Sequence, residues 1–151
     1  MTEIPTIKVK RLPHARDLPL PTRATIGSSG CDLCAALAGT IRLRPGERKL
    51  IPTGLRYEIP QGYEVQVRSR SGLAFKQGIA VLNSPGTIDA DYRGEVCVIL
   101  INHGAESVAI NHGDRIAQAV PLQVAPEVSF IEVDKLEESQ RGSGGFGSTG
   151  S

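Results

Sequence analysis

Residues 55–68, L-R-Y-E-I-P-Q-G-Y-E-V-Q-V-R, hold the pattern that decides the fold. Two short runs of strand-forming residues, 55–59 and 63–68, flank the turn signal Gln61-Gly62. The same succession of a short strand and a turn recurs along the chain, at a spacing that matches antiparallel connections better than helical crossovers. The other turn signals are Pro45-Gly46, Thr53-Gly54, Pro85-Gly86, His103-Gly104 and His112-Gly113.

Short strands with frequent turns predict an all-β sandwich or barrel. One short helix is expected, beginning around Ser71 and stopping at Gly78. No internal repeat is present in the sequence. The remaining predicted strands are residues 7–12, 31–36, 40–43, 95–102, 107–110, 116–124 and 128–133.

The length of 151 residues is that of one domain. With 17 Lys and Arg against 16 Asp and Glu, the net charge is +1, so no overall field attracts nucleic acid or an anionic membrane. No apolar run approaches the ~20 residues of a membrane span, and residues 1–5 lack the features of a signal peptide. We therefore expect a soluble, cytoplasmic protein with neither nucleic acid nor membrane as partner.

The cysteines Cys31, Cys34 and Cys97 are odd in number, which favours reduced thiols over a disulfide framework. The C-D-L-C pair raises the alternative of a redox or zinc site. Residues three apart on a strand point to opposite faces, and the sequence holds no second cysteine pair or suitable histidine spacing to complete a zinc shell. The histidines, predicted at the surface, are His14, His103 and His112.

Residues 84–95, S-P-G-T-I-D-A-D-Y-R-G-E, place two carboxylates, a tyrosine and an arginine between turn residues and an apolar strand. Pro85-Gly86 and Arg93-Gly94 bracket a tight connection. We therefore expect Asp89, Asp91 and Tyr92 on a rigid hairpin, where a carboxylate suits the work of a general base. The alternative is a hairpin whose aspartates only cap backbone donors.

The C-terminal stretch differs from the rest, because D-K-L-E-E-S-Q and R-G-S-G-G-F-G-S-T-G-S offer almost no apolar side chain to a core. The sequence thus divides into a β domain over residues 1–133 and a flexible glycine-rich arm over residues 134–151. A plain linker is one interpretation of the arm. The other is a ligand-closing segment, in which Arg141 and Ser148 reach phosphate oxygens and the isolated Phe146 covers a nucleobase.

Residues 68–74, R-S-R-S-G-L-A, form a second phosphate signal. A helix start offers free N–H donors and a partial positive charge to an anion. Arg70 and Ser71 add a guanidinium and a hydroxyl at that point. Ordinary capping by serine and a solvated arginine would explain the same residues.

Together these segments resemble the trimeric dUTPase family, the dUTP nucleotidohydrolases, whose five motifs occur here in the family's order over almost the whole chain. The resemblance implies an antiparallel jelly roll of six to eight strands, and a homotrimer whose composite active sites use residues of all three chains. Ser69 stands where the family usually has proline, and Thr87 where an aliphatic residue is usual; neither change removes a catalytic group. The motifs begin near Asp32, Arg70, Gly86, Gly113 and Arg141.

The resemblance further implies a dUTP pyrophosphatase that forms dUMP and pyrophosphate, which lowers dUTP and supplies dUMP for dTMP synthesis. Asp89 would be the catalytic base that activates water, with Mg²⁺ on the triphosphate and Asp32 acting on the metal through its water shell. The substrate-binding residues that it implies are Arg70, Ser71, Gly72, Asn83, Gly86, Thr87, Ile88, Asp89, Tyr92, Cys97, Gln118, Arg141, Phe146, Gly147 and Ser148.

Within that set, the resemblance assigns uracil to Asn83, Cys97 and the backbone of residues 87–89. Tyr92 would stack on the deoxyribose and leave no room for a 2′-hydroxyl. The groups implied for the phosphate chain are Arg70, Ser71, Gly72 and Gln118, with Arg141, Ser148 and Phe146 of the arm closing over the nucleotide.

Two other functions stay open at this point. A dCTP deaminase-like enzyme shares the fold and the nucleotide pocket, but it would need a glutamate base where this chain has Asp89, and it is not expected to carry the arm. A non-enzymatic trimer would use the fold for binding or regulation. Asp89 and the intact fifth motif argue against it, and an assay of pyrophosphate release decides between them.

Overall fold

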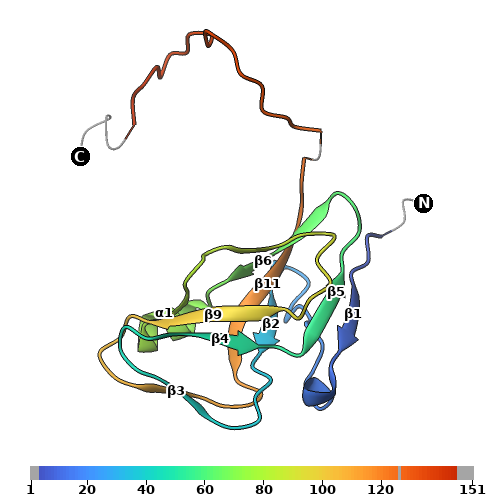
Figure 1. The fold of residues 1–151 in the computed structure, drawn as a ribbon, viewed down its shortest axis with the longest axis vertical. Coiled ribbons are helices and arrows are strands. Elements are labelled where there is room, and N and C mark those ends of the chain that lie inside the picture. Colours follow the sequence, from blue (N-terminus) through green and yellow to red (C-terminus); the bar gives the residue numbers. More distant parts are fainter. Residues whose placement is uncertain (1–3, 126, 146–151) are drawn as a thin grey trace.

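Antiparallel strands make up the body of the molecule (Figure 1). The computed structural model describes residues 4–125 and 127–145. The strands are β1 Lys8–Arg11, β2 Cys31–Cys34, β3 Ile41–Leu43, β4 Arg48–Pro52, β5 Leu55–Glu58, β6 Tyr63–Arg68, β7 Ile79–Val81, β8 Gly86–Ile88, β9 Cys97–Asn102, β10 Val108–Ile110 and β11 Arg115–Gln123, and the helical elements are the 3-10 turn η1 Pro13–Ala15 and the helix α1 Ser71–Gln77.

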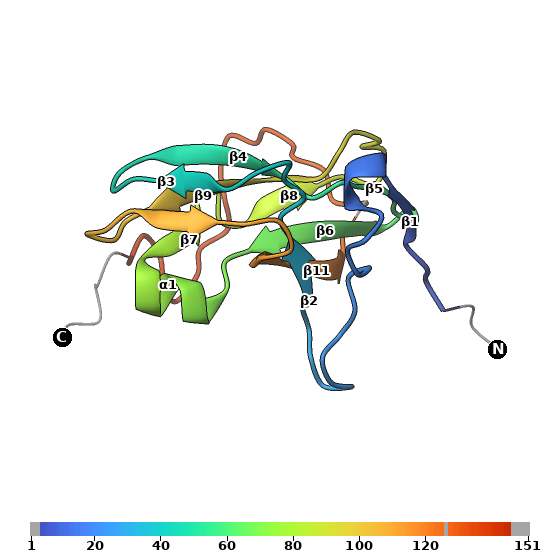
Figure 2. The same cartoon turned by 90° about the horizontal axis from the view of Figure 1, so that it is seen from below.

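Two main sheets form the layers of the fold. One has the strand order β2-β11-β6-β8 and the other β4-β9-β7, and the ribbons β1-β5 and β10-β3 complete the body. Figure 2 shows β4 and β9 on one side and β6 and β11 on the other. Every pairing is antiparallel. The predicted all-β antiparallel fold is confirmed, with eleven short strands among the described residues instead of six to eight.

The core lies between the two main sheets because their strands alternate inward and outward side chains. On β9, Val98 and Leu100 are buried, and so is Asn102 at its end. The Asn102 amide is satisfied there, since Nδ2 donates to the carbonyls of Leu43 and Glu106, each at 2.8 Å. The buried Asn102 amide therefore links β9 to β3, and its donor group is not left without a hydrogen-bond partner.

Three strands were absent from the sequence prediction and one predicted strand is wrong. The sequence missed β4, β7 and β8, of which the last two have only three residues each. Residues 128–133, predicted as a strand, form none in the described chain, and Phe130 and Ile131 are 101% and 80% exposed. Alternating apolar residues indicate strand propensity, but a strand also needs an edge to pair with.

The turn signals predicted from glycine and proline all fall at the passage from one strand to the next, but in every case the two strands belong to different sheets. In the stretch 55–68, β5 pairs with β1 while β6 pairs with β11 and β8. Likewise β8 is the edge of the four-stranded sheet, whereas β9 is the centre of the three-stranded one. Residues 89–96 therefore cross between the sheets, and the predicted hairpin around Asp89 is wrong. Turn residues mark a reversal of the chain and do not choose the pairing partner.

The predicted helix is confirmed as α1, which ends at Gly78 as expected. No helix within the described ranges is long and apolar enough to cross a bilayer. After β11 the chain leaves the sheets as an extended segment (Figure 1), and residues 127–143 are exposed. The predicted boundary between a β domain and an arm after residue 133 stays a prediction.

Candidate active site

A cavity of about 310 Å³ lies where the connection between β8 and β9 meets β4. We call it the loop pocket. It gathers six of the predicted substrate-binding residues, which come from three stretches of the sequence. Its lining residues are Leu50, Asn83, Thr87, Ile88, Asp89, Tyr92, Glu95, Val96, Cys97 and Ile99.

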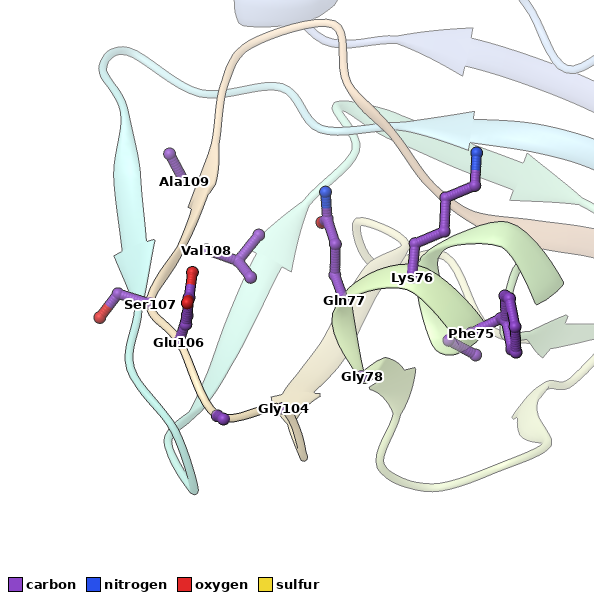
Figure 3. A pocket seen from close by; sticks show the side chains of 11 residues that line it. Phe75, Lys76, Gln77, Gly78, Gly104, Glu106, Ser107, Val108 and Ala109 are labelled. Carbon is purple, nitrogen blue, oxygen red and sulfur yellow. The ribbon is translucent and has the colours of Figure 1, made fainter.

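A larger cavity of about 670 Å³ lies between α1 and residues 104–109 (Figure 3). Its ionisable lining side chains are Lys76 and Glu106, and Gln77 and Val108 face each other across it. None of the predicted site residues lines it. Chemistry depends on the groups that converge in a cavity more than on its size, so we place the candidate active site at the loop pocket.

Asp89 presents its carboxylate at the exposed side of the loop pocket. The loop is held by its own bonds, because the Asp89 carbonyl accepts the Tyr92 N–H at 3.2 Å and Arg93 Nη1 donates to the Ala90 carbonyl at 2.6 Å. Across residues 4–125 and 127–145, the Asp89 carboxylate makes no hydrogen bond or ion pair. The capping alternative is therefore not realised there, and the carboxylate is open to a ligand.

The Tyr92 side chain curls back over its own turn. Its hydroxyl donates to the Glu95 carbonyl at 3.0 Å. A β-carbon on Gly94 would lie 2.3 Å from that hydroxyl oxygen, so the ring can take this position only over glycine. The ring is 45% exposed and faces the loop pocket. An aromatic face in this position can cover a sugar.

The other walls of the loop pocket offer backbone, a thiol and apolar side chains. Ile88 lines the cavity but is buried, so it offers little surface to a ligand. Burial raises the pKa of the Cys97 thiol, and the nearby Glu95 carboxylate raises it further, so Cys97 stays protonated. Leu50 is 62% exposed at the cavity, and Ile99 adds a second aliphatic side chain.

Sequence reasoning missed four residues of this lining. Glu95 was visible inside the motif at residues 84–95 but had no role assigned to it. Leu50 carried no signal, because β4 itself was not predicted. Val96 and Ile99 both lie on the strand predicted over residues 95–102, and only the tertiary fold brings them to the cavity.

A second group, which we call the arginine cluster, consists of Asp32, Arg70 and Arg115. Arg70 Nε donates to Asp32 Oδ1 at 2.9 Å, and Arg115 Nη1 lies 3.4 Å from Asp32 Oδ2. Arg70 Nη1 also donates to the Arg115 carbonyl at 3.2 Å. Gln118 stands opposite Asp32 in the ladder between β11 and β2. Two predicted phosphate-binding groups and the predicted metal-linked carboxylate are thus neighbours.

The remaining predicted residues lie in other places. Ser71 and Gly72 are exposed in the first turn of α1, where no side chain caps the helix. Gly86 is buried in β8. In the exposed arm, Arg141 Nε donates to the Gly144 carbonyl at 2.7 Å. The predicted residues that fall outside the described ranges are Phe146, Gly147 and Ser148.

The cysteines and histidines hold no metal centre in the part of the chain that the structure describes, where no group of three or more His, Cys, Asp and Glu side chains converges. The cysteines are free thiols. Two histidines lie within hydrogen-bond distance of a carboxylate at a partly exposed surface. His14 Nε2 lies 2.8 Å from Glu95 Oε1, and His112 Nε2 lies 2.8 Å from Asp17 Oδ2.

Comparison with known proteins gives one consistent result. A family model described as dUTPase matches residues 16–150. The deoxyuridine 5'-triphosphate nucleotidohydrolase of Methylocella silvestris is 56% identical over 152 residues, covering 99% of this chain and 94% of that protein. The protein of the same name from Caulobacter vibrioides is 52% identical over 155 residues and covers 99% of both.

Solved structures agree with these relatives. A variant dUTPase of Staphylococcus bacteriophage 80alpha with bound dUpNHpp has a TM-score of 0.83 at 28% identity, covering 97% of this chain and 99% of that one. A variant dUTPase from phage phi11 of S. aureus, described with a structural Mg(II) ion, has a TM-score of 0.73 at 25% identity, covering 87% and 99%.

Proposed function

Because the chain belongs to the dUTPase family and is a dUTP diphosphatase, we propose that it hydrolyses dUTP to dUMP and pyrophosphate with Asp89 as the general base. The observation that carries this assignment is the Asp89 carboxylate in the loop pocket, which pairs with no other described residue and lies beside Tyr92 and Asn83. The reaction lowers the dUTP level and supplies dUMP for dTMP synthesis.

In the proposed step, Asp89 accepts a proton from water as the water oxygen attacks the α-phosphorus. The bond from the α-phosphorus to the bridging oxygen breaks, and pyrophosphate leaves with that oxygen. A positioned carboxylate supplies ~10²–10⁴-fold of the rate in such steps. The exposed carboxylate and the hydrogen-bonded loop that carries it support this role.

We assign the uracil base to the loop pocket, with Asn83, Cys97 and the backbone of residues 87–89. The protonated thiol and the buried Ile88 are consistent with a neutral base as the ligand. Tyr92 covers the deoxyribose in this proposal. Its ring leaves no room for a 2′-hydroxyl, so ribonucleotides are excluded by steric clash.

The triphosphate is assigned to Arg70, Ser71, Gly72 and Gln118. Guanidinium groups bind phosphate oxygens through charge-assisted hydrogen bonds. Arg70 is 25% exposed at its side chain, so it can reach a ligand.

Mg²⁺ fits this arrangement as an ion held mainly by phosphate oxygens and water, because Mg²⁺ sites of this kind use only one or two carboxylates. The partly exposed Asp32 carboxylate would accept hydrogen bonds from the water around the ion. When bound, the ion stabilises the charge that develops on the phosphate oxygens. The related phage dUTPase described with a structural Mg(II) ion is consistent with this cofactor.

A homotrimer is proposed for the assembly, with the arm closing over the nucleotide through Arg141, Phe146, Gly147 and Ser148. The loop pocket and the arginine cluster share no residue, which supports a site completed by another subunit. The exposed Phe130 and Ile131 also favour a partner, since proteins that stay monomeric rarely expose neighbouring large apolar side chains. Free thiols suit the reducing cytoplasm.

The proposal is tested by incubating the protein with dUTP, dCTP, dTTP and UTP in the presence of Mg²⁺. We expect dUMP and pyrophosphate from dUTP and little turnover of the other three. Comparable turnover of dCTP or UTP would remove the specificity assigned to the loop pocket. Ammonia release from dCTP would indicate a deaminase instead.

The composite site has its own test by subunit mixing. An Asp89→Asn chain and a chain without residues 141–151 should each be nearly inactive alone. Mixed under conditions that allow subunits to exchange, they should recover part of the activity, since one chain supplies the base and the other supplies the arm. A monomer by light scattering would contradict the composite site.

A further inference from the structure

Glu95 holds together three parts of the chain that meet behind the loop pocket. Its Oε1 accepts the Gly54 N–H at 2.8 Å, and the same oxygen lies 2.8 Å from His14 Nε2. Gly54 follows β4 at the turn into β5, and His14 belongs to η1. One carboxylate oxygen therefore joins the N-terminal turn, the β4–β5 turn and the loop that crosses between the sheets.

Local packing holds the Gly54 N–H in the position from which it donates to Glu95. Gly54 has φ +67°, and a β-carbon there would lie 2.2 Å from the Ala15 β-carbon. Ala15 is itself completely buried, and the Gly54 carbonyl accepts the Leu12 N–H at 2.7 Å. This close contact between η1 and the β4–β5 turn fixes the position of the Gly54 N–H, and thus the position at which the Glu95 carboxylate can accept it.

Glu95 is also the residue on which Tyr92 rests. The Tyr92 hydroxyl donates to the Glu95 carbonyl, and the ring lies over Gly94. On the other side, the Val96 N–H donates to the Leu55 carbonyl at 2.8 Å, which ties the chain to β5. The backbone hydrogen bond to Leu55 fixes the position of Val96. The side-chain contacts of the carboxylate fix Glu95 itself, and with it the Glu95 carbonyl that accepts the tyrosine hydroxyl.

We propose that Glu95 is a positioning residue for Tyr92. The Glu95 carboxylate is anchored by Gly54 and His14 and thereby fixes the tyrosine ring. A fixed ring increases the discrimination between deoxyribose and ribose. The inference rests on the proposed role of Tyr92 at the sugar. A ring excludes a 2′-hydroxyl only if it cannot shift aside, since steric discrimination requires a wall that does not give way.

The test compares Glu95→Ala with Glu95→Gln in the full-length protein. Alanine removes both anchors, whereas the glutamine carbonyl can still accept the Gly54 N–H. We expect Glu95→Ala to lower the ratio of kcat/KM for dUTP to that for UTP about tenfold, chiefly by improving UTP relative to dUTP. Glu95→Gln should restore most of the ratio.

Asp17→Ala is the matched control. It removes another carboxylate from a histidine at the same distance of 2.8 Å, at a site outside the loop pocket. It should leave the dUTP to UTP ratio unchanged. If Glu95→Ala lowers kcat/KM equally for both nucleotides, Glu95 is only structural and the inference is wrong.

A second readout does not need activity. The chain has three tyrosines, Tyr57, Tyr63 and Tyr92, so ring-¹³C-labelled tyrosine gives a simple spectrum, in which Tyr92→Phe identifies the Tyr92 signal. Glu95→Ala should move that signal and leave the other two in place. An unmoved Tyr92 signal overturns the inference.

The two proposals can fail separately. A wild-type protein that does not hydrolyse dUTP contradicts the proposed function, while the tyrosine spectrum still decides whether Glu95 positions the ring. If Glu95→Ala does not fold, His14→Ala removes one anchor alone. It should lower the dUTP to UTP ratio about two- to fivefold and shift the Tyr92 signal in the same direction, and no change in either measurement contradicts the inference.

Discussion

The loop pocket and the arginine cluster differ in how their charged groups are used before a ligand arrives. In the loop pocket, the Asp89 carboxylate pairs with no other described residue, and hydrogen bonds hold the loop that carries it. In the arginine cluster, Asp32 accepts from Arg70 and also lies beside Arg115. Under the proposed function, Asp89 gives up no bond to another described residue when dUTP binds, whereas Arg70 must exchange its ion pair with Asp32 for the triphosphate.

The largest effect on activity is expected from a substitution at Asp89 in the loop pocket. Asp89→Asn keeps the size of the side chain but removes the base, so we expect kcat to fall about 10²–10⁴-fold with the affinity for a non-hydrolysable dUTP analogue nearly unchanged. Steady-state kinetics and titration calorimetry measure the two quantities. A variant with near-normal kcat would falsify the assignment of the base.

The next largest effect is expected at Arg70. Arg70→Ala removes charge-assisted hydrogen bonds worth about 1.5–3 kcal/mol, so kcat/KM for dUTP should fall about 10–150-fold. The affinity for deoxyuridine should stay unchanged, because the proposed function places the base and the sugar in the loop pocket. Arg68→Ala is the control, since it removes a nearby exposed arginine whose guanidinium bonds, among the described residues, only to Gln66. An equal loss in both variants would show a general charge effect.

The arm should matter through Phe146, although that residue lies outside the described ranges. Stacking of an aromatic ring on a base is worth ~1–3 kcal/mol, so Phe146→Ala should lower kcat/KM about 5–150-fold. The melting temperature without ligand should not change, whereas the stabilisation by a dUTP analogue should shrink with the affinity. A lower melting temperature of the free variant would mean that Phe146 is packed in the core.

The smallest effect is predicted for the ion pair of the arginine cluster. Partly exposed ion pairs contribute about 0.2–1 kcal/mol, so without Mg²⁺ the Asp32→Asn variant should bind a dUTP analogue about 1.4–5-fold more tightly than wild type. The gain arises because Arg70 no longer has an internal carboxylate as its ion-pair partner. With Mg²⁺ the gain should vanish or reverse if Asp32 orders water around the ion. Weaker binding without Mg²⁺ would contradict the exchange of partners.

Local sequence signals predicted those features that depend on a few adjacent residues. The helix α1 ends at Gly78 because a glycine in the left-handed conformation terminates a helix through local geometry. The strand at residues 63–68 was predicted with its observed ends, since its residues favour an extended chain. The same local signals failed at residues 128–133, where an extended apolar run has no strand beside it in the described chain.

The motifs by themselves determined which groups are assigned to the proposed site, because a reaction dictates residue types such as Asp89 and Arg70 and these can be read one at a time. Only the tertiary structure decided how those groups are held. Glu95 receives Gly54 from 41 positions away and His14 from 81. Asp32 meets Arg70 from a distance of 38 residues. Contacts between residues so far apart in the sequence depend on which strands pair and on where the chain crosses between sheets. Turn residues and strand propensities carry no information about either.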